Sequence, residues 1–131
     1  TLGGGPHRPP PVSRRNAAAR PAYHGRMAAE DLETDYLVIG AGAAGMAITD
    51  ALLSHSDATI TLIDRRHAPG GHWLDAYPFV RLHQPSSFYG VCSVPLGVNA
   101  LDSRGTNAGY YELAGVDEIR AYYAHVMQRH F

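Results

Sequence analysis

The chain has 131 residues, 45% of them hydrophobic, which allows one modest buried core and not two. Its net charge of −1 is unevenly spread, because residues 1–26 carry five arginines and no acid while residues 27–131 carry six arginines and twelve acids. The mildly acidic main part argues against a nucleic-acid partner, and no apolar run approaches the roughly 20 residues of a membrane span. Cys92 is the only cysteine, which excludes an intrachain disulfide and a cysteine-rich metal site and favours a cytoplasmic setting.

Residues 1–33 are predicted to form a disordered, basic arm rich in proline, glycine and alanine. Such a segment cannot bury enough apolar area to offset its conformational entropy. An arginine pair in the arm lacks the apolar stretch that an export signal requires after it. We hypothesise that residues 1–26 precede the true start of the protein at Met27.

The first two predicted elements are a strand and a helix. Residues 35–40 form a short apolar run that ends at a glycine, as buried parallel strands do. Residues 43–55 are predicted to be helical, with Met46, Leu52 and Leu53 on or near one face. Several alanines in this helix allow close packing against the strand.

A second strand, a long loop region and a final helix complete the predicted elements. Residues 58–64 are apolar and β-branched, which predicts the strand. Residues 65–115 are rich in proline and glycine, so we expect mainly loops, with short strands only near residues 79–82 and 109–113. Residues 116–130 are predicted to form an amphipathic helix with two acids in its first turn, where the helix dipole favours negative charge. Its apolar face consists of Ile119, Tyr122, Tyr123, Val126 and Met127.

A G-x-G-x-x-G motif, Gly40-Ala-Gly42-Ala-Ala-Gly45, lies between the first predicted strand and helix. Such a motif arises by chance in chains rich in glycine and alanine, but here a second strand follows and ends in Asp64, 22 positions beyond Gly42. This order and spacing are those of a dinucleotide-binding fingerprint. Gly40 would allow the tight turn, Gly42 the approach of a pyrophosphate, and Gly45 the close packing of helix on strand.

The predicted ligand contacts follow from this geometry. The N–H groups of Ala43 and Ala44, in the first helical turn, would face the phosphates with the helix dipole behind them. Asp64 would accept hydrogen bonds from both ribose hydroxyls, and its charge would repel the 2′-phosphate of NADP, although Arg65 lies next to it. FAD and NAD both remain candidate ligands at this point. The alternative is a plain glycine-rich turn with a solvated carboxylate at the end of the strand.

The residues that follow resemble a known family. Residues 64–73, Asp-Arg-x-x-x-x-Gly-Gly-His-Trp, are similar to a segment of the flavin-containing and Baeyer–Villiger-type monooxygenases. The resemblance implies that the G-x-G-x-x-G motif binds FAD and that Gly70, Gly71 and Trp73 lie at the flavin site. A glycine pair allows close approach of the backbone, and an indole offers a flat apolar wall.

Residues 77–89 also look like a stretch of this family, the one that lines the flavin pocket. The residues that the resemblance carries over are Leu82, His83, Gln84 and Ser86. His72 and His83 become candidates for hydrogen bonds to the edge of the flavin. Simpler structural alternatives stay open, because Trp73 suits core packing equally well. Thr49 departs from the family's motif, which has Gly or Ala there, and a threonine could loosen the packing of helix on strand.

The resemblance further implies an α/β fold in which residues 34–131 form part of a Rossmann-like FAD-binding domain. The function implied is a flavin-dependent oxidoreductase, most similar to an NADPH-dependent monooxygenase that acts on a small molecule. Another parallel strand and an NADPH-binding domain would lie downstream, so we expect an N-terminal part of a longer enzyme. An NAD-dependent dehydrogenase and a non-catalytic, truncated remnant are the alternatives. We assign no catalytic side chain and expect no metal, because the histidines lack the spacing of metal ligands.

Overall fold

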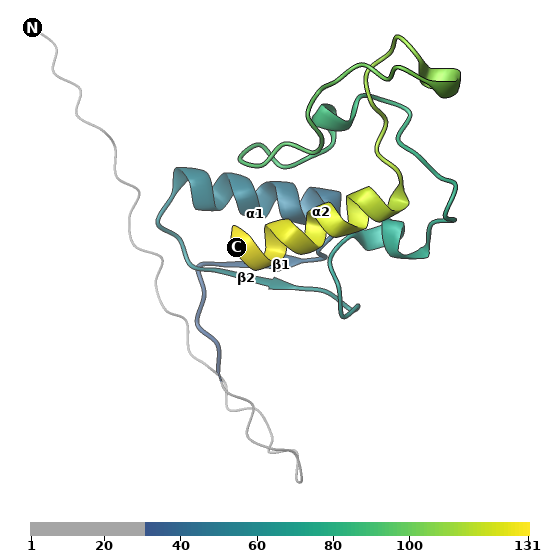
Figure 1. Ribbon diagram of the computed structural model, residues 1–131. Helices are drawn as coiled ribbons and strands as arrows, with labels where there is room; N and C mark the ends of the chain where they lie inside the picture. The colour runs from purple at the N-terminus through teal and green to yellow at the C-terminus, as the bar shows by residue number, and fades with distance from the viewer. Residues whose placement is uncertain (1–30) are drawn as a thin grey trace, which may run out of the picture. The chain divides into compact units, whose positions relative to one another are not determined.

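The computed structural model describes residues 31–131 (Figure 1). The predicted disordered arm therefore lies almost entirely outside the described residues. In chain order the helices and strands are β1 (Tyr36–Ile39), α1 (Ala43–His55), β2 (Ile60–Ile63) and α2 (Val116–Arg129). The α/β architecture and the predicted order of strand, helix, strand and final helix are confirmed.

The two strands form a parallel sheet and pair residue for residue over their whole length. At the amino end, the N–H of Thr59 donates a 2.8 Å hydrogen bond to the Asp35 carboxylate, and this bond lowers the pKa of Asp35. At the carboxyl end, the N–H of Gly40 donates to the Ile63 carbonyl at 2.7 Å. The register therefore brings the glycine-rich turn beside Asp64, at the edge where ligands of α/β sheets bind.

One buried cluster joins both helices and the loops between them. Figure 1 shows α1 and α2 over the same side of the sheet. The cluster consists of Ala41, Met46, Trp73, Leu82, Val91, Leu96, Ala114, Val116, Ile119, Tyr122, Tyr123 and Val126. In α1 the predicted apolar face is correct at Met46, which is fully buried, whereas Leu53 is 43% exposed. The other buried positions of α1 belong to the polar residues Thr49 and Asp50.

These two polar residues are buried because both find partners within the chain. The hydroxyl of Thr49 donates to the Gly45 carbonyl at 2.8 Å, one helical turn earlier. The Asp50 carboxylate accepts hydrogen bonds from the backbone N–H of Ser93, at 3.1 Å, and from its hydroxyl. A buried polar group is tolerated when it is hydrogen-bonded. The threonine that departs from the family's motif is thus accommodated without an unpaired hydroxyl.

The segment Val91–Val94, which we call the clamped loop, is held by side chains from both helices. Asp50 of α1 binds it through Ser93. From α2, the hydroxyl of Tyr122 accepts from the first N–H of the loop and donates to its last carbonyl, both at 2.6 Å. Burial raises the pKa of Tyr122, which keeps the hydroxyl protonated and able to donate.

The final helix α2 is the predicted amphipathic helix. The N–H of Gly115 donates to the Glu118 carboxylate at 2.7 Å and so caps its first turn. The buried residues of α2 are Val116, Ile119, Tyr122, Tyr123 and Val126. Arg120 donates to the carbonyls of Trp73 and Leu74 at 2.9 and 2.8 Å, which ties α2 to the loop after β2.

The segment between β2 and α2 contains short 3-10 turns in place of the predicted strands. The turns span Gly71–Asp75, Ser86–Phe88 and Gly105–Asn107. Two isolated antiparallel bridges form, between Arg81 and Gly115 and between Leu101 and Tyr111. The prediction of strands near residues 79–82 and 109–113 was therefore wrong. Prolines at positions 78 and 85 lack the N–H that a continuous ladder needs.

The sheet has one face that α1 does not cover. Leu37, Ile39 and Ile63 are 55%, 78% and 45% exposed. Side chains alternate along a strand, so these three point away from the face on which Val38 approaches Gly45 of α1. Within the described residues the uncovered face is thus mainly apolar, and Thr61, which pairs with Leu37, is its polar member.

Candidate functional site

The glycine-rich turn has the backbone geometry that its sequence predicts. Gly40 has a φ of +107°, a backbone conformation that residues other than glycine rarely adopt. A Cβ at Gly45 would lie only 1.7 Å from the Gly40 carbonyl oxygen. The absence of a side chain at Gly45 therefore allows α1 to start directly against the end of β1. The turn role of Gly40 and the packing role of Gly45 are confirmed.

A second glycine-rich segment, Gly70-Gly71, packs against this turn. The N–H of Gly70 donates to the Ala41 carbonyl at 2.8 Å. Gly71 has a φ of +57°, and a Cβ there would lie 2.9 Å from the Gly42 Cα. Two backbones thus meet without side chains between them. This contact brings the two glycine-rich segments of the sequence to one place.

Asp64 stands at the end of β2 and is tied to both neighbouring segments. One carboxylate oxygen accepts from the Ala41 N–H at 2.7 Å and the other from the Arg66 N–H at 2.8 Å. These bonds, the one from Arg66 first, lower the pKa of Asp64, so the group is a carboxylate at neutral pH. Each carboxylate oxygen can accept a further hydrogen bond, and a ribose hydroxyl is a suitable donor.

The two glycine segments and Asp64 surround a cavity of about 530 Å³, which we call the glycine cavity. Its lining residues are Ile39, Gly40, Gly42, Asp64, Arg65, Arg66, Gly71, His72 and Asp75. This volume is within the roughly 300–1,000 Å³ of small-molecule sites. α1 starts at Ala43, directly beside the cavity residue Gly42. Ala43 and Ala44 do not themselves line the cavity, but the first N–H groups of a helix have no partner within it, so theirs remain available to an anion.

Two charged residues of the glycine cavity were missed by the sequence analysis. The guanidinium of Arg66 donates to the Gly71 carbonyl and forms an ion pair with Asp75. Arg65, which the sequence analysis did single out, is exposed at the rim. No spacing rule distinguishes one arginine of this adjacent pair from the other, because the contact depends on the path of the loop between them and Gly71.

Other predicted site residues lie elsewhere. Trp73 is 5% exposed, donates from its indole nitrogen to the Tyr89 hydroxyl and does not line the glycine cavity. Trp73 therefore packs in the core in this structure, as the structural alternative predicts. His72 does line the cavity, with its ring centroid 5.0 Å from that of Trp73. The exposed His83 and the buried Leu82 do not line it.

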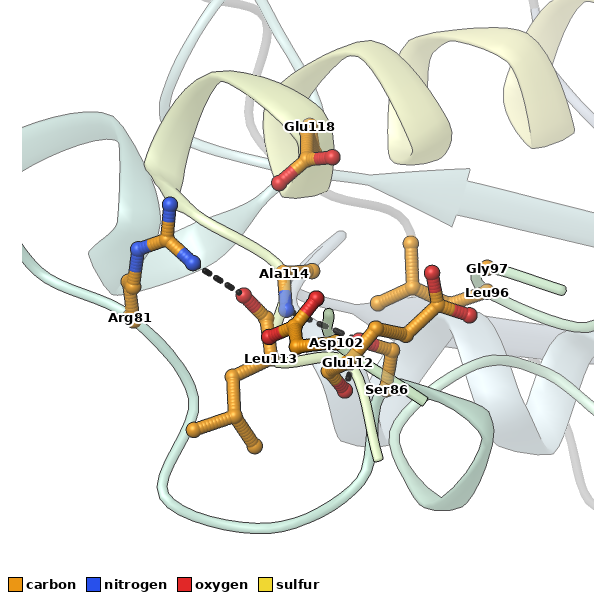
Figure 2. Close-up of a pocket in the computed structure, with 9 residues that line it drawn as sticks. All are labelled: Arg81, Ser86, Leu96, Gly97, Asp102, Glu112, Leu113, Ala114 and Glu118. Carbon is orange, nitrogen blue, oxygen red and sulfur yellow. Dashed lines mark hydrogen bonds between the residues drawn. The ribbon is translucent and has the colours of Figure 1, made fainter. Parts of the chain in front are cut away.

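A second cavity, of about 320 Å³, lies among the loops before α2 (Figure 2). Its lining residues are Arg81, Ser86, Leu96, Gly97, Asp102, Glu112, Leu113, Ala114 and Glu118. The lining thus includes three carboxylates and one arginine, and the guanidinium of Arg81 donates to the Leu113 carbonyl at 3.3 Å. This acidic cavity would repel a diphosphate, so the glycine cavity is the better candidate for a dinucleotide.

The described residues also bear on metal binding, on membrane spans and on the kind of ligand that the glycine cavity suits. Between residues 31 and 131, no group of three or more His, Cys, Asp or Glu side chains could hold a metal ion. Neither helix of this part of the chain is long and apolar enough to cross a membrane. The glycine cavity offers backbone N–H groups as donors for a diphosphate and the Asp64 carboxylate as an acceptor for ribose hydroxyls, an arrangement that suits a dinucleotide.

Several curated proteins are similar to the chain over most of its length. Proteins of Mycobacterium tuberculosis and Mycobacterium bovis, both described as uncharacterized, are 59% identical to it over 101 residues. The match covers 77% of the chain and 19% of each relative. The chain thus spans about a fifth of the length of the curated relatives that it matches.

Solved structures share its fold. A flavin-containing monooxygenase from Stenotrophomonas maltophilia and a double mutant of that enzyme each align with a TM-score of 0.56 and 24% sequence identity. Each alignment covers 73% of this chain and 26% of the monooxygenase chain. The fold of most of the chain therefore has a counterpart of known structure.

A family model identifies the group to which this fold belongs. The model of the NAD(P)-binding Rossmann-like domain matches residues 38–109, more than half of the chain. The matched range begins in β1 and includes both glycine segments, β2 and Asp64. These are the parts that form the glycine cavity. The chain belongs to the NAD(P)-binding Rossmann-like domain family.

Proposed function

We propose that the chain is the FAD-binding part of a flavin-dependent oxidoreductase. One observation carries the proposal. The backbones of Gly42 and Gly71 are in contact, and together with the ionised Asp64 they line a single cavity. A diphosphate would bind the backbone N–H groups at the start of α1. The Asp64 carboxylate would accept hydrogen bonds from the adenosine ribose.

The electrostatics of the glycine cavity favour this arrangement of ligand groups. The amino end of α1 carries a partial positive charge that stabilises a phosphate. Asp64 would repel a 2′-phosphate, which argues against NADP at this cavity. Arg66 is neutralised by Asp75, which leaves Arg65 as the unpaired cation among the lining residues that the structure describes.

Two features favour FAD over NAD. The Gly-Gly segment that packs on the turn is the part of the sequence that resembles flavin-dependent monooxygenases. The fold is also similar to that of a flavin-containing monooxygenase. Once bound, the flavin would supply the redox chemistry. The chain would bind the adenosine and diphosphate groups and hold them in a fixed position.

The finer function extends beyond these residues. By the same resemblance we propose NADPH as the reductant, bound by a separate domain, and a small molecule as the substrate of a monooxygenase-like reaction. The cytoplasm is the proposed location. Because the chain spans 19% of its curated relatives, these proposals concern the longer protein.

A ligand panel tests the proposal. The thermal midpoint of the chain would be measured with FAD, NAD and NADP, because a ligand that binds only the native state stabilises it by about 2.7 kcal/mol at one hundred times its Kd. We expect FAD to raise the midpoint and NADP to leave it unchanged. In the control variant Asp64→Ala, we expect a smaller shift with FAD. A shift with NAD alone would support the dehydrogenase alternative, and no shift with any ligand would support the non-catalytic remnant.

A further inference from the structure

Two adjacent arginines of the glycine cavity have different surroundings. The Arg66 guanidinium contacts the Gly71 carbonyl and the Asp75 carboxylate, and its side chain is only 25% exposed. Arg65 is exposed, and no hydrogen bond or ion pair of its side chain is found within residues 31–131. The first arginine after Asp64 is thus free, whereas the second is built into the structure.

The carbonyl that Arg66 contacts belongs to a critical position of the site. Gly71 has a left-handed backbone with a φ of +57°, and its Cα faces Gly42 so closely that a Cβ would lie 2.9 Å from the Gly42 Cα. The contact with the glycine-rich turn therefore restricts the position of Gly71 on one side. Arg66 holds the peptide group of Gly71 from a second side.

We propose that Arg66 is a positioning residue, which holds the Gly70-Gly71 segment against the glycine-rich turn before any ligand binds. The inference rests on the proposed function, since it concerns binding of a diphosphate at the same cavity. A pre-formed site binds more tightly because the ligand does not have to order it. Without Arg66, the bond from the Gly70 N–H to the Ala41 carbonyl would remain, but the carbonyl side of Gly71 would be held less firmly and could shift away from Gly42.

The two contacts of Arg66 contribute unequally. Asp75 is 68% exposed on its side chain, and exposed ion pairs contribute little to stability. The bond to the Gly71 carbonyl is the one that sets the position of the backbone, because it acts on the segment itself. Asp75 also adds negative charge to the cavity that we propose for a diphosphate. Loss of Asp75 should therefore leave binding unchanged or improve it.

The experiment is a titration of the 131-residue chain with FAD, followed by flavin fluorescence, and with ADP, followed by calorimetry. For Arg66→Ala we expect about tenfold weaker binding of both ligands, the lower end of the effect of losing one hydrogen bond to a charged group. The matched control is Arg104→Ala, which removes an exposed arginine that does not line the glycine cavity. For this control we expect binding within about twofold of the wild type, because an exposed charge contributes little. Equal losses in the two variants would overturn the proposal.

A double variant separates positioning from charge. If Arg66 acts only by balancing Asp75, then Arg66→Ala combined with Asp75→Asn should bind like the wild type, and the proposal would be wrong. If Arg66 positions the segment, the double variant should remain about as weak as Arg66→Ala. Asp75→Asn alone should bind at least as tightly as the wild type.

Hydrogen exchange on the ligand-free chain makes the test independent of the proposed function. The Gly70 N–H is bonded to the Ala41 carbonyl, so its exchange reports on the contact between the two glycine segments. Arg66→Ala should speed this exchange and leave the amides of β1 and β2 unchanged, which also shows that the variant is folded. Unchanged exchange at Gly70 would refute positioning. If the wild type binds neither FAD nor ADP, the proposed function fails while this result still decides the role of Arg66.

Discussion

The glycine-rich turn and the clamped loop are both held firmly, but by opposite means. In the turn, backbone meets backbone because side chains are absent at Gly45 and Gly71. In the clamped loop, the side chains of Asp50 and Tyr122 bind the backbone groups directly. The first arrangement leaves backbone N–H groups available to a ligand. In the clamped loop the N–H groups of Val91 and Ser93 are already hydrogen-bonded to side chains. The comparison supports the proposal that the turn binds a ligand, whereas the clamped loop contributes to stability.

The largest effect is expected in the turn. Gly45→Ala should prevent normal folding or cost at least about 3 kcal/mol, because overpacking of a backbone contact has no flexible side chain to absorb it. A Cβ there would lie 1.7 Å from the Gly40 carbonyl oxygen. Urea denaturation followed by circular dichroism measures the loss. In the matched control, Gly42→Ala, the nearest atom to the new Cβ is at 3.5 Å, so stability should stay close to that of the wild type. Similar stability of the two variants would contradict this account of the turn.

An intermediate effect is expected in the clamped loop. Tyr122→Phe removes the hydroxyl that binds the first N–H and the last carbonyl of the loop, both at 2.6 Å. Leaving these groups unpaired should lower the free energy of unfolding by about 1–3 kcal/mol. The adjacent Tyr123 has a buried hydroxyl without a hydrogen-bond partner in the described part of the chain. Tyr123→Phe is therefore the control and should change stability by less than about 0.5 kcal/mol. If both variants lost the same stability, the clamp would not be what holds the loop.

The smallest effect is expected from pH. The pKa values of Asp35 and Asp64 are lowered by hydrogen bonds from the backbone N–H groups of Thr59 and Arg66. A lowered pKa in the folded state adds stability above the ordinary value of 3.8, and this stability is lost as the pH falls through the folded-state value. The thermal midpoint of the wild type should therefore decrease as the pH is lowered below about 4. In Asp64→Asn this decrease should be less steep. A variant with the same pH profile as the wild type would argue against the ionised carboxylate.

The regular elements of this fold could be predicted from local patterns. β1, α1, β2 and α2 follow from runs of apolar residues at the period of a strand or helix, and the turn follows from three glycines at fixed spacing. Each of these signals lies within a few neighbouring residues, so it needs no knowledge of the tertiary structure. The position of Asp64 at the end of the second strand was readable for the same reason.

The remaining features depend on contacts between distant residues. Asp50 is buried because Ser93, 43 residues further along the chain, meets it. Trp73 lies in the core because Tyr89 offers its indole a partner, although its neighbours in sequence suit a ligand site equally well. The role of Arg66 depends on a loop that returns to it at Gly71. No pattern in the sequence marks such pairs.

The central claim is that main-chain N–H groups at the start of α1 bind a diphosphate. The most direct measurement is a nuclear magnetic resonance titration of the ¹⁵N-labelled chain with ADP, with adenosine as the control ligand that lacks phosphate. We predict that ADP shifts the amide signals of Gly42, Ala43, Ala44 and Gly71 and that adenosine leaves them in place. Amide signals of these residues that do not respond to saturating ADP, or shifts confined to the acidic cavity, would contradict the account.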